Sequence, residues 1–574
     1  MTTQKTSTPT NSWLNLLVIL LCFILSGVAA LVYQTAWTRQ FSLVFGTSEL
    51  AAAAVLAAYM GGLALGAYLI EQYIQKIKRP VKWYAILEIG IAVAAVVLIP
   101  VGLWLSEKLL VVLFGGQSSP PTSTLSGTSL FYLIAAFAVL LVPTTLMGAT
   151  LPLLARHTVH NEQQIGRRIG LLYACNTSGA VAGALLGALV LLPKFGLDRT
   201  VWIAAAINAF VALLALTLAN TAADTIEKTH SNDDAAHQAH EPWSARISPV
   251  WVLPIMLCSG AVSFLHEVLW TRMLGHVMGS SLYAFGIMLA SFLAGIALGG
   301  GLGAVMARSR EVAARWLAVS EFAAAAAAIF AWWRIQQIST AVDSLSQRGW
   351  FSFWSLFPLA FAIGLTYPLA VRVLARNVND AAPASARVYS WNTVGAILGA
   401  ITGGFLIVPA LRYEGTVHLA VIASCLLAVI TALVLFKPNK LFGIPLILSA
   451  ITAGAVFMPK APEALLRYSP LRVNGQGEML FYDVGRSAAV VALRQGDQIA
   501  VRTNSLPEAS IDGVGALPQL YVEAWMAPLA VLARPQIQDM LIIGLGGARV
   551  LEAVPPSVHA IDVIELEDKV VEAN

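Results

Sequence analysis

The chain has 574 residues, of which 58% are hydrophobic and 11% are charged, and its mean hydropathy is +0.74. Soluble domains carry about a quarter charged residues, so this composition excludes a soluble protein and predicts a polytopic α-helical membrane protein whose main partner is the lipid bilayer. The formal net charge of +4 is small for this length, and no nucleic-acid partner is expected.

Twelve apolar runs are each long enough to cross a hydrocarbon core of about 30 Å. Lipid offers no hydrogen-bond partners to the backbone, so such runs must be helices. We expect six spans in a first membrane repeat, residues 1–220, and six in a second, residues 249–437. The expected spans are 13–35, 49–70, 83–105, 128–150, 170–192, 199–219, 249–270, 282–306, 313–333, 351–374, 389–411 and 415–436.

The two sets of six spans carry the same residues at fixed spacings, which predicts an internal duplication. At a spacing of 233, the first members are Ser26, Gly27, Trp37, Thr38, Arg39, Gly46, Ser48, Gly62, Gly66 and Glu88. At a spacing of 216, they are Gly148, Pro152, Arg156, Tyr173, Asn176, Thr177, Gly179, Gly183, Gly187 and Pro193. Few of these residues are apolar side chains, so shared hydrophobicity alone does not explain the matches.

Basic residues concentrate in the loops after the second, fourth, eighth and tenth expected spans, for example Lys76, Arg156, Arg308 and Arg372. The positive-inside rule places these loops and the N-terminus in the cytoplasm. Six spans return the chain to its starting side, so the halves are expected to be parallel repeats about an axis normal to the membrane. This is the topology of the major facilitator transporters.

The polar segment 221–248 joins the two repeats, and we expect it to be a solvated cytoplasmic linker. Its His and Asp residues are not fixed by a rigid element, so no metal site is expected. The four cysteines all fall within expected spans, which argues against disulfides and metal clusters.

A further apolar segment, residues 438–458, has two possible interpretations. If its apolar run 441–458 spans the membrane, it is a thirteenth helix, and everything after it lies outside the cytoplasm. If it lies along the membrane or forms a re-entrant hairpin, the C-terminal part is cytoplasmic.

Polar side chains within the expected spans are costly in lipid, so each is a functional candidate. They form duplicated pairs, which are Gln34 with Glu267, Arg39 with Arg272, Glu88 with Glu321, and Asn176 with Asn392. Two mirrored sets of polar groups could line a central cavity.

Each pair has a structural alternative. Glu88 and Glu321 lie roughly 9 Å inside their spans at 1.5 Å per residue, as salt-bridged locks or as part of a cation path. The arginines stand at span ends, where they could anchor the helix at the interface. Glycines at four-residue intervals after the two asparagines predict tight helix packing, with substrate contact by the Asn side chains as the alternative.

From residue 459 the pattern changes to short alternating strands, which predicts a β-rich subdomain over 459–535. Residues 536–574 show a strand, a glycine turn, a helix and a strand ending in an acid, the start of a Rossmann-type unit. Gly544 and Gly546 would let the backbone approach a ligand. Glu565, 21 residues after Gly544, would accept hydrogen bonds from ribose hydroxyls.

These motifs resemble those of spermidine synthases, which are aminopropyltransferases with a methyltransferase-type fold. The motifs are Tyr521-Val-Glu523, Pro528-Leu529, Leu541-Ile-Ile-Gly-Leu-Gly-Gly547 and Val563-Ile-Glu565-Leu-Glu567. With the repeated Trp-Thr-Arg and Tyr-x-x-Asn-Thr motifs, nearly the whole chain looks like the bacterial proteins described as fused major-facilitator and spermidine synthase proteins. That resemblance implies a multi-pass protein of the bacterial inner membrane.

The resemblance also implies a site and an activity. The residues that bind decarboxylated S-adenosylmethionine or a related nucleoside would be Gly544, Gly546, Gly547 and Glu565. Tyr521 and Glu523 would face the substrate. The reaction would be aminopropyl transfer to a small cationic amine of the polyamine type, which the membrane bundle binds or moves, with Glu88 and Glu321 as its candidate contacts.

The chain departs from the family pattern in three places. Gly547 stands where Asp is usual, the segment 501–508 lacks an Asp-Gly-x-x-Gln motif, and the chain stops at Asn574, before the family's catalytic Asp loop. We therefore expect a truncated domain, either a fragment of a longer protein or a degenerate binding module, without an assigned catalytic residue. The alternative function is a transporter or membrane scaffold with an inactive synthase-like domain.

Overall fold

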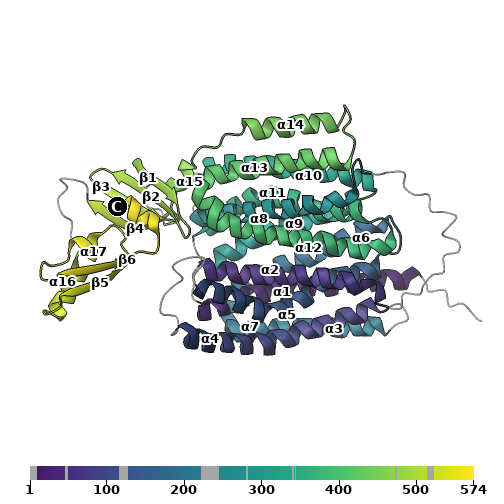
Figure 1. Ribbon diagram of the computed structural model, residues 1–574, viewed down its shortest axis with the longest axis horizontal. Coiled ribbons are helices and arrows are strands. Elements are labelled where there is room, and N and C mark those ends of the chain that lie inside the picture. The colour runs from purple at the N-terminus through teal and green to yellow at the C-terminus, as the bar shows by residue number, and fades with distance from the viewer. Residues whose placement is uncertain are drawn as a thin grey trace, which may run out of the picture.

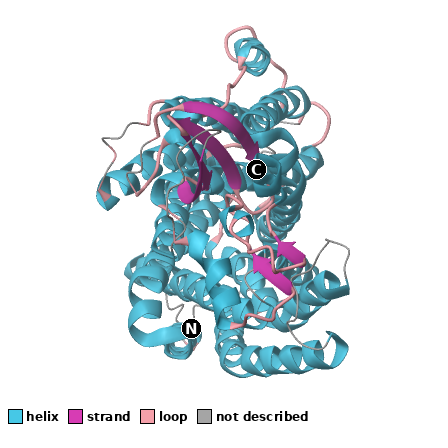
Figure 2. Ribbon diagram, turned by 90° about the vertical axis from the view of Figure 1, so that its left-hand side faces the viewer, coloured by secondary structure: helices cyan, strands magenta, loops and turns pink. Residues whose placement is uncertain are grey.

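The computed structural model describes residues 9–45, 49–114, 127–220, 245–279, 282–338, 342, 344–471, 475–512 and 522–574. Long helices with nearly parallel axes form one body, and a smaller region with two sheets lies at one end of it (Figure 1). The view toward that end shows the two sheets as separate units on the helical body (Figure 2).

The first half of the helical body is built from segments rich in Ala, Leu, Val and Gly. They are α1 Pro9–Phe45, α2 Glu49–Tyr73, η1 Ile74–Lys76, α3 Pro80–Val93, η2 Ala94–Leu98, α4 Ile99–Phe114, α5 Gly127–Thr158, α6 Gln164–Leu186, η3 Gly187–Leu191 and α7 Leu192–Ala219. The segments η2 and η3 are single π-helical turns within longer helices.

The second half has a similar composition. It comprises η5 Pro249–Trp251, α8 Val252–Met278, α9 Leu282–Met306, α10 Arg310–Gln336, α11 Leu345–Leu374, α12 Val378–Thr402, η6 Gly403–Ile407 and α13 Val408–Leu435. A π-helical turn, η6, again precedes the last of these helices.

Ten helices in the described part of the chain are long and apolar enough to cross a membrane. Two of them, Gln164–Ala219 with 56 residues and Val378–Leu435 with 58, each contain two of the twelve expected spans. At 1.5 Å per residue such a stretch is roughly 85 Å long, far more than one crossing needs. Each is broken at one residue with a non-helical backbone, Gly196 in the first half and Arg412 in the second.

Close helix contacts recur at matching positions of the two halves. A Cβ atom at Gly27 in α1 would lie 2.1 Å from the carbonyl oxygen of Asn176 in α6. A Cβ atom at Gly260 in α8 would lie 2.1 Å from the carbonyl oxygen of Asn392 in α12. Only glycine allows these backbones to approach so closely. The predicted tight helix packing at both Asn positions is therefore present.

The two halves share a hydrophobic core near the basic loops. Ile19 and Leu172 from the first half are buried in one cluster with Leu317 and Leu369 from the second. The two halves therefore pack as one body in this structure.

The helix α14, Gly443–Val456, carries the chain from one end of the bundle to the other. It begins beside Pro438 and runs antiparallel to α13, so that Gly454 lies beside Cys425 and the Phe457 ring contacts His418. With 14 residues it is shorter than the ten membrane-length helices. Figure 1 shows it alongside α13 and α10.

The chain therefore leaves the bundle at the end opposite to the basic loops. Helix α10 starts at Arg310, next to a basic loop, and ends at Gln336. The side-chain amide of Gln336 donates to the carbonyl oxygen of Lys460, 3.2 Å away, just after α14. The C-terminal region thus begins at the far end of α10.

The C-terminal region consists of two sheets and short helices. After α15, Glu463–Arg467, an antiparallel meander contains β1 Glu478–Val484, β2 Ala489–Gln495, β3 Gln498–Thr503 and β4 Leu506–Asp512 in that order. Then follow α16 Glu523–Ala533, β5 Asp539–Ile543, α17 Arg549–Glu552, β6 Ala560–Ile564 and α18 Asp568–Ala573. The strands β5 and β6 form a parallel pair. A pair alone does not define a Rossmann-type sheet, which remains a prediction.

Candidate functional site

The glycine turn follows β5 at the carboxyl ends of both parallel strands. The Gly544 N–H donates to the carbonyl oxygen of Ile564, 2.8 Å away, at the end of β6. Gly544 and Gly546 have φ angles of 87° and 54°, a region in which side chains are disfavoured. A Cβ atom at Gly544 would meet nothing within 4 Å, so this glycine serves the turn's conformation and leaves its outer face open.

Glu565 lies directly against this turn. One carboxylate oxygen accepts a hydrogen bond from the Leu545 N–H at 2.8 Å, and the other accepts from the N–H groups of Leu566 and Glu567. The structure therefore brings together the two predicted parts of the nucleoside site. A carboxylate offers about four acceptor positions, so ribose hydroxyls could share it with these donors.

Gly547 has a different environment from the other two glycines. A Cβ atom there would lie 2.7 Å from the Cβ of Ala509 and 3.1 Å from a side-chain carbon of Ile511, both in β4. The small residue thus allows the turn to pack on the meander. This packing gives a structural reason for glycine where the family has Asp.

The two predicted substrate residues are not brought to the glycine turn. Tyr521 lies outside the described residues. Glu523 opens α16 and is exposed, and within the described residues no hydrogen bond or ion pair joins it to the Gly544 turn.

Glu567, two residues after the predicted ribose contact, closes the β1–β2 turn. Its carboxylate accepts hydrogen bonds from the N–H groups of Ser487 and Ala488, at 3.0 and 3.1 Å, and is only 8% exposed. Sequence reasoning missed this role because both glutamates follow the same strand. The acid joins the parallel pair to the meander.

An ion-pair network connects the C-terminal region to the bundle. Asp483 in β1 accepts from Lys569 in α18 and from Arg412 at the break before α13, both at 2.8 Å. Partial burial favours a higher pKa for Asp483, but the hydrogen bonds from Lys569, the Val484 N–H and Arg412 outweigh it and lower this pKa. The same contact with Asp483 raises the pKa of Lys569.

Two further side chains of α8 contact the C-terminal region. Arg272 donates to the carbonyl oxygens of Gly485, at 3.2 Å, and of Gly404 in η6, at 3.1 Å. The ring nitrogens of His276 contact the Ser505 hydroxyl at 2.6 Å and the Tyr413 hydroxyl at 3.0 Å. Arg272 thus links α8 to the β1–β2 turn. Arg39, its duplicate in α1, is exposed.

Glu88 holds three helices of the first half together. It is fully buried in α3 and accepts hydrogen bonds from Ser26 in α1, at 2.7 Å, and from Asn208 in α7. In the second half, Glu321 contacts Ser259, while one of its carboxylate oxygens is buried without a hydrogen-bond partner. These contacts favour a structural lock, although hydrogen bonds and not salt bridges make it.

Glu267 differs from the other membrane acids. It lies near the middle of α8, retains partial exposure, and has no hydrogen bond or ion pair within the described residues. Its duplicate Gln34 is also partly exposed in α1. Thr271 follows Glu267 by four residues and therefore lies on the same face of α8.

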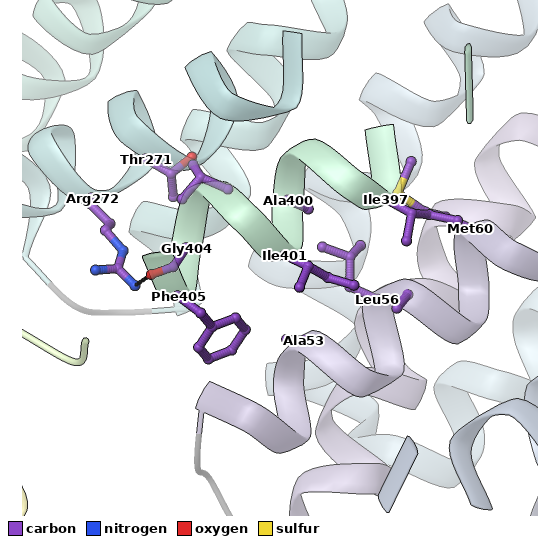
Figure 3. Close-up of a pocket in the computed structure, with 12 residues that line it drawn as sticks. Ala53, Leu56, Met60, Thr271, Arg272, Ile397, Ala400, Ile401, Gly404 and Phe405 are labelled. Carbon is purple, nitrogen blue, oxygen red and sulfur yellow. Dashed lines mark hydrogen bonds between the residues drawn. The ribbon is translucent and has the colours of Figure 1, made fainter. Parts of the chain in front are cut away.

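A cavity of about 450 Å³ lies between the two halves. Helix α2 forms one wall, and α8 with α12 and η6 forms the others (Figure 3). Its lining residues are Ala53, Leu56, Ala57, Met60, Val268, Thr271, Arg272, Ile397, Ala400, Ile401, Gly404 and Phe405. Arg272 is the charged member of this lining, and the described lining includes no acid.

Comparison with protein-family models found none that matches this chain, and comparison with curated proteins found no match either. What the structure itself defines is a class: a chain with a large helical region of membrane-length helices, compatible with a multi-pass membrane protein, followed by a small region of sheets.

Proposed function

We propose that this chain is a membrane-bound protein of the spermidine synthase type, which transfers an aminopropyl group to a polyamine-type amine. The observation that carries the proposal is the contact between the glycine turn and Glu565, with 2.8 Å from the Leu545 N–H to the carboxylate. Both lie at the carboxyl ends of parallel strands, where α/β folds bind nucleosides.

The proposed co-substrate is decarboxylated S-adenosylmethionine. Its ribose hydroxyls would donate to Glu565, and its thioether chain would pass the open face of Gly544. The amine nitrogen attacks the carbon next to the sulfonium, the carbon–sulfur bond breaks, methylthioadenosine leaves, and the new ammonium loses a proton. The described residues supply the nucleoside half of such a site, and no catalytic base is assigned.

The experiment that tests this function is calorimetric binding of methylthioadenosine to the purified protein. We expect binding by the wild type and its loss in Glu565→Ala. Glu552→Ala is a matched control, since Glu552 is an exposed acid on the neighbouring helix α17. Equal binding by the wild type and Glu565→Ala would exclude this site.

Within this proposal, the membrane part is a facilitator-like pair of parallel repeats. The matched approaches of Gly27 to Asn176 and of Gly260 to Asn392 support the duplication. So does the position of the helix breaks, because Gly196 and Arg412 are separated by the spacing of 216 that relates the second matching block.

We assign recognition of the amine to Glu267 in preference to Glu88 or Glu321. Glu88 already accepts two hydrogen bonds between helices, and both Glu88 and Glu321 are buried within one half. Glu267 retains exposed surface and has no partner among the described residues. Glu267→Gln should abolish spermidine binding to the bundle, while Gln34→Glu, its duplicate position, should not weaken it.

A transporter or membrane scaffold with an inactive synthase-like domain is the second candidate, and one observation favours it. The C-terminal region begins at the bundle end opposite to the basic loops. If those loops are cytoplasmic, this region faces the outside, where S-adenosyl nucleosides are not expected to be supplied.

A further inference from the structure

We propose that the cavity between the two halves is a binding site for an acidic membrane phospholipid, with its phosphate on Arg272 and an acyl chain along the apolar walls. This inference is independent of the nucleoside site and of the amine. It rests on the distribution of charge along the cavity, on its apolar lining and on its place in the bundle.

The cavity has one polar end and one apolar end. Arg272 and Gly404 lie at one end, and Met60 and Ile397 lie at the other (Figure 3). Along α2, the lining extends from Ala53 to Met60, a rise of about 10 Å. A ligand that fits must therefore be amphipathic, with its polar group beside the guanidinium.

The sign of the polar group follows from Arg272. This residue lies six positions before Met278, the last residue of α8, which places it about 9 Å from the helix end. A guanidinium at this depth stays charged, and its fork of N–H donors matches phosphate oxygens. Its printed acceptors, Gly404 and Gly485, are neutral carbonyl groups. An anionic head group therefore complements this end of the cavity.

The bilayer is the natural source of the ligand. Ile401 lines the cavity and is 39% exposed, and its neighbours Leu398 and Leu406 are exposed as well. In a membrane these side chains face hydrocarbon, so a lipid chain can enter the cavity from the side. The volume of about 450 Å³ lies within the range of about 300–1,000 Å³ typical of ligand pockets.

The experiment compares lipid retention by native mass spectrometry of the full chain in a non-ionic detergent. The probes are phosphatidylglycerol, phosphatidylcholine and palmitate. The variants are Arg272→Gln, which removes the charge, and Ala400→Leu, which fills the cavity and keeps Arg272. Arg39→Gln is the matched control, because Arg39 is the duplicate position, is exposed and does not line the cavity.

We expect the wild type and Arg39→Gln to retain phosphatidylglycerol, and both Arg272→Gln and Ala400→Leu to bind it about tenfold more weakly or worse. Because Arg272 also contacts Gly485, Arg272→Gln could disturb the C-terminal region, and Ala400→Leu then provides the independent evidence. Retention of phosphatidylcholine as strong as that of phosphatidylglycerol would overturn the proposal. So would unchanged binding by Ala400→Leu, or binding of palmitate without phosphatidylglycerol, which would identify a free fatty acid as the ligand.

Discussion

Glu88 shows how a buried acid in a membrane can serve packing and not transport. Its two carboxylate oxygens are occupied by donors from α1 and α7, so the charge is stabilised where it stands. A lone charge at this depth is costly, and hydrogen bonds reduce that cost. The duplicated position Glu321 has kept the acid with fewer partners.

Glu88→Gln should destabilise the first half more than Glu321→Gln destabilises the second. A glutamine can accept from Ser26, but its amide nitrogen then faces the Asn208 amide, so that two donors meet. We expect a loss of about 1–3 kcal/mol for Glu88→Gln, measured by denaturant unfolding in detergent. Equal losses for both variants would contradict the difference in hydrogen bonding.

The individual contacts of the candidate site were only partly predictable. The Gly544 turn and Glu565 could be paired from sequence because a strand, a turn and a strand set their separation. The roles of Glu567 and Gly547 could not, since each depends on packing against the β-meander, 38 or more residues away in sequence. The contact of His276 with Ser505 joins residues 229 positions apart, and local pattern does not reveal such a pair.

At the scale of elements, glycines determine how closely the helices approach. The helices α1 and α6 meet at Gly27, and α8 and α12 meet at Gly260, with the neighbouring backbone only 2.1 Å from where a side chain would begin. Hydropathy predicted the runs 170–192 and 199–219 as two spans. The structure joins them through a π-helical turn and a break at Gly196, which hydropathy cannot distinguish from a loop.

Gly260→Ala should lower the melting temperature of the detergent-purified protein, because the added methyl group forces α8 away from the Asn392 carbonyl. Gly275→Ala in the same helix is the control. A Cβ atom at Gly275 meets nothing within 4 Å, so alanine should be neutral or stabilise by about 1 kcal/mol through its better helix propensity. If the two variants behave alike, close packing at Gly260 is not what limits stability.

The contact between β1 and the bundle should depend on pH through Asp483. Its pKa is lowered in the folded state, so its contribution is present above the ordinary Asp pKa of about 3.9 and is lost as pH falls through the lowered value. Asp483→Asn should therefore lose stability at pH 7 and show a smaller further loss under acid. Glu478→Gln, whose pair with Arg494 is exposed, should follow the wild-type acid profile in the same unfolding assay.

At the scale of the whole molecule, α14 decides where the C-terminal region lies. The apolar run 441–458 had two interpretations, and the structure shows α14 running along α13 from Pro438 toward His418. Length alone could not decide this, because the helix of 14 residues is shorter than an ordinary span. Its packing on α13 and α10 supplies the missing information (Figure 1).

The C-terminal region and the basic loops should therefore lie on opposite sides of the membrane. Asp497→Cys places a thiol on the exposed β2–β3 turn, and Lys78→Cys places one in an exposed basic loop. In intact cells, a membrane-impermeant maleimide should label the first and not the second, above the background of the four native cysteines. Labelling of both or of neither would show that the two regions share a side.

The measurement that tests the proposed function most directly is a calorimetric titration of the full chain with methylthioadenosine and with decarboxylated S-adenosylmethionine. The wild type and Glu552→Ala should bind both nucleosides, and Glu565→Ala should bind neither, because it removes the carboxylate beside the Gly544 turn. If the folded wild type binds neither nucleoside, the synthase-type proposal is contradicted and the transporter or scaffold is favoured.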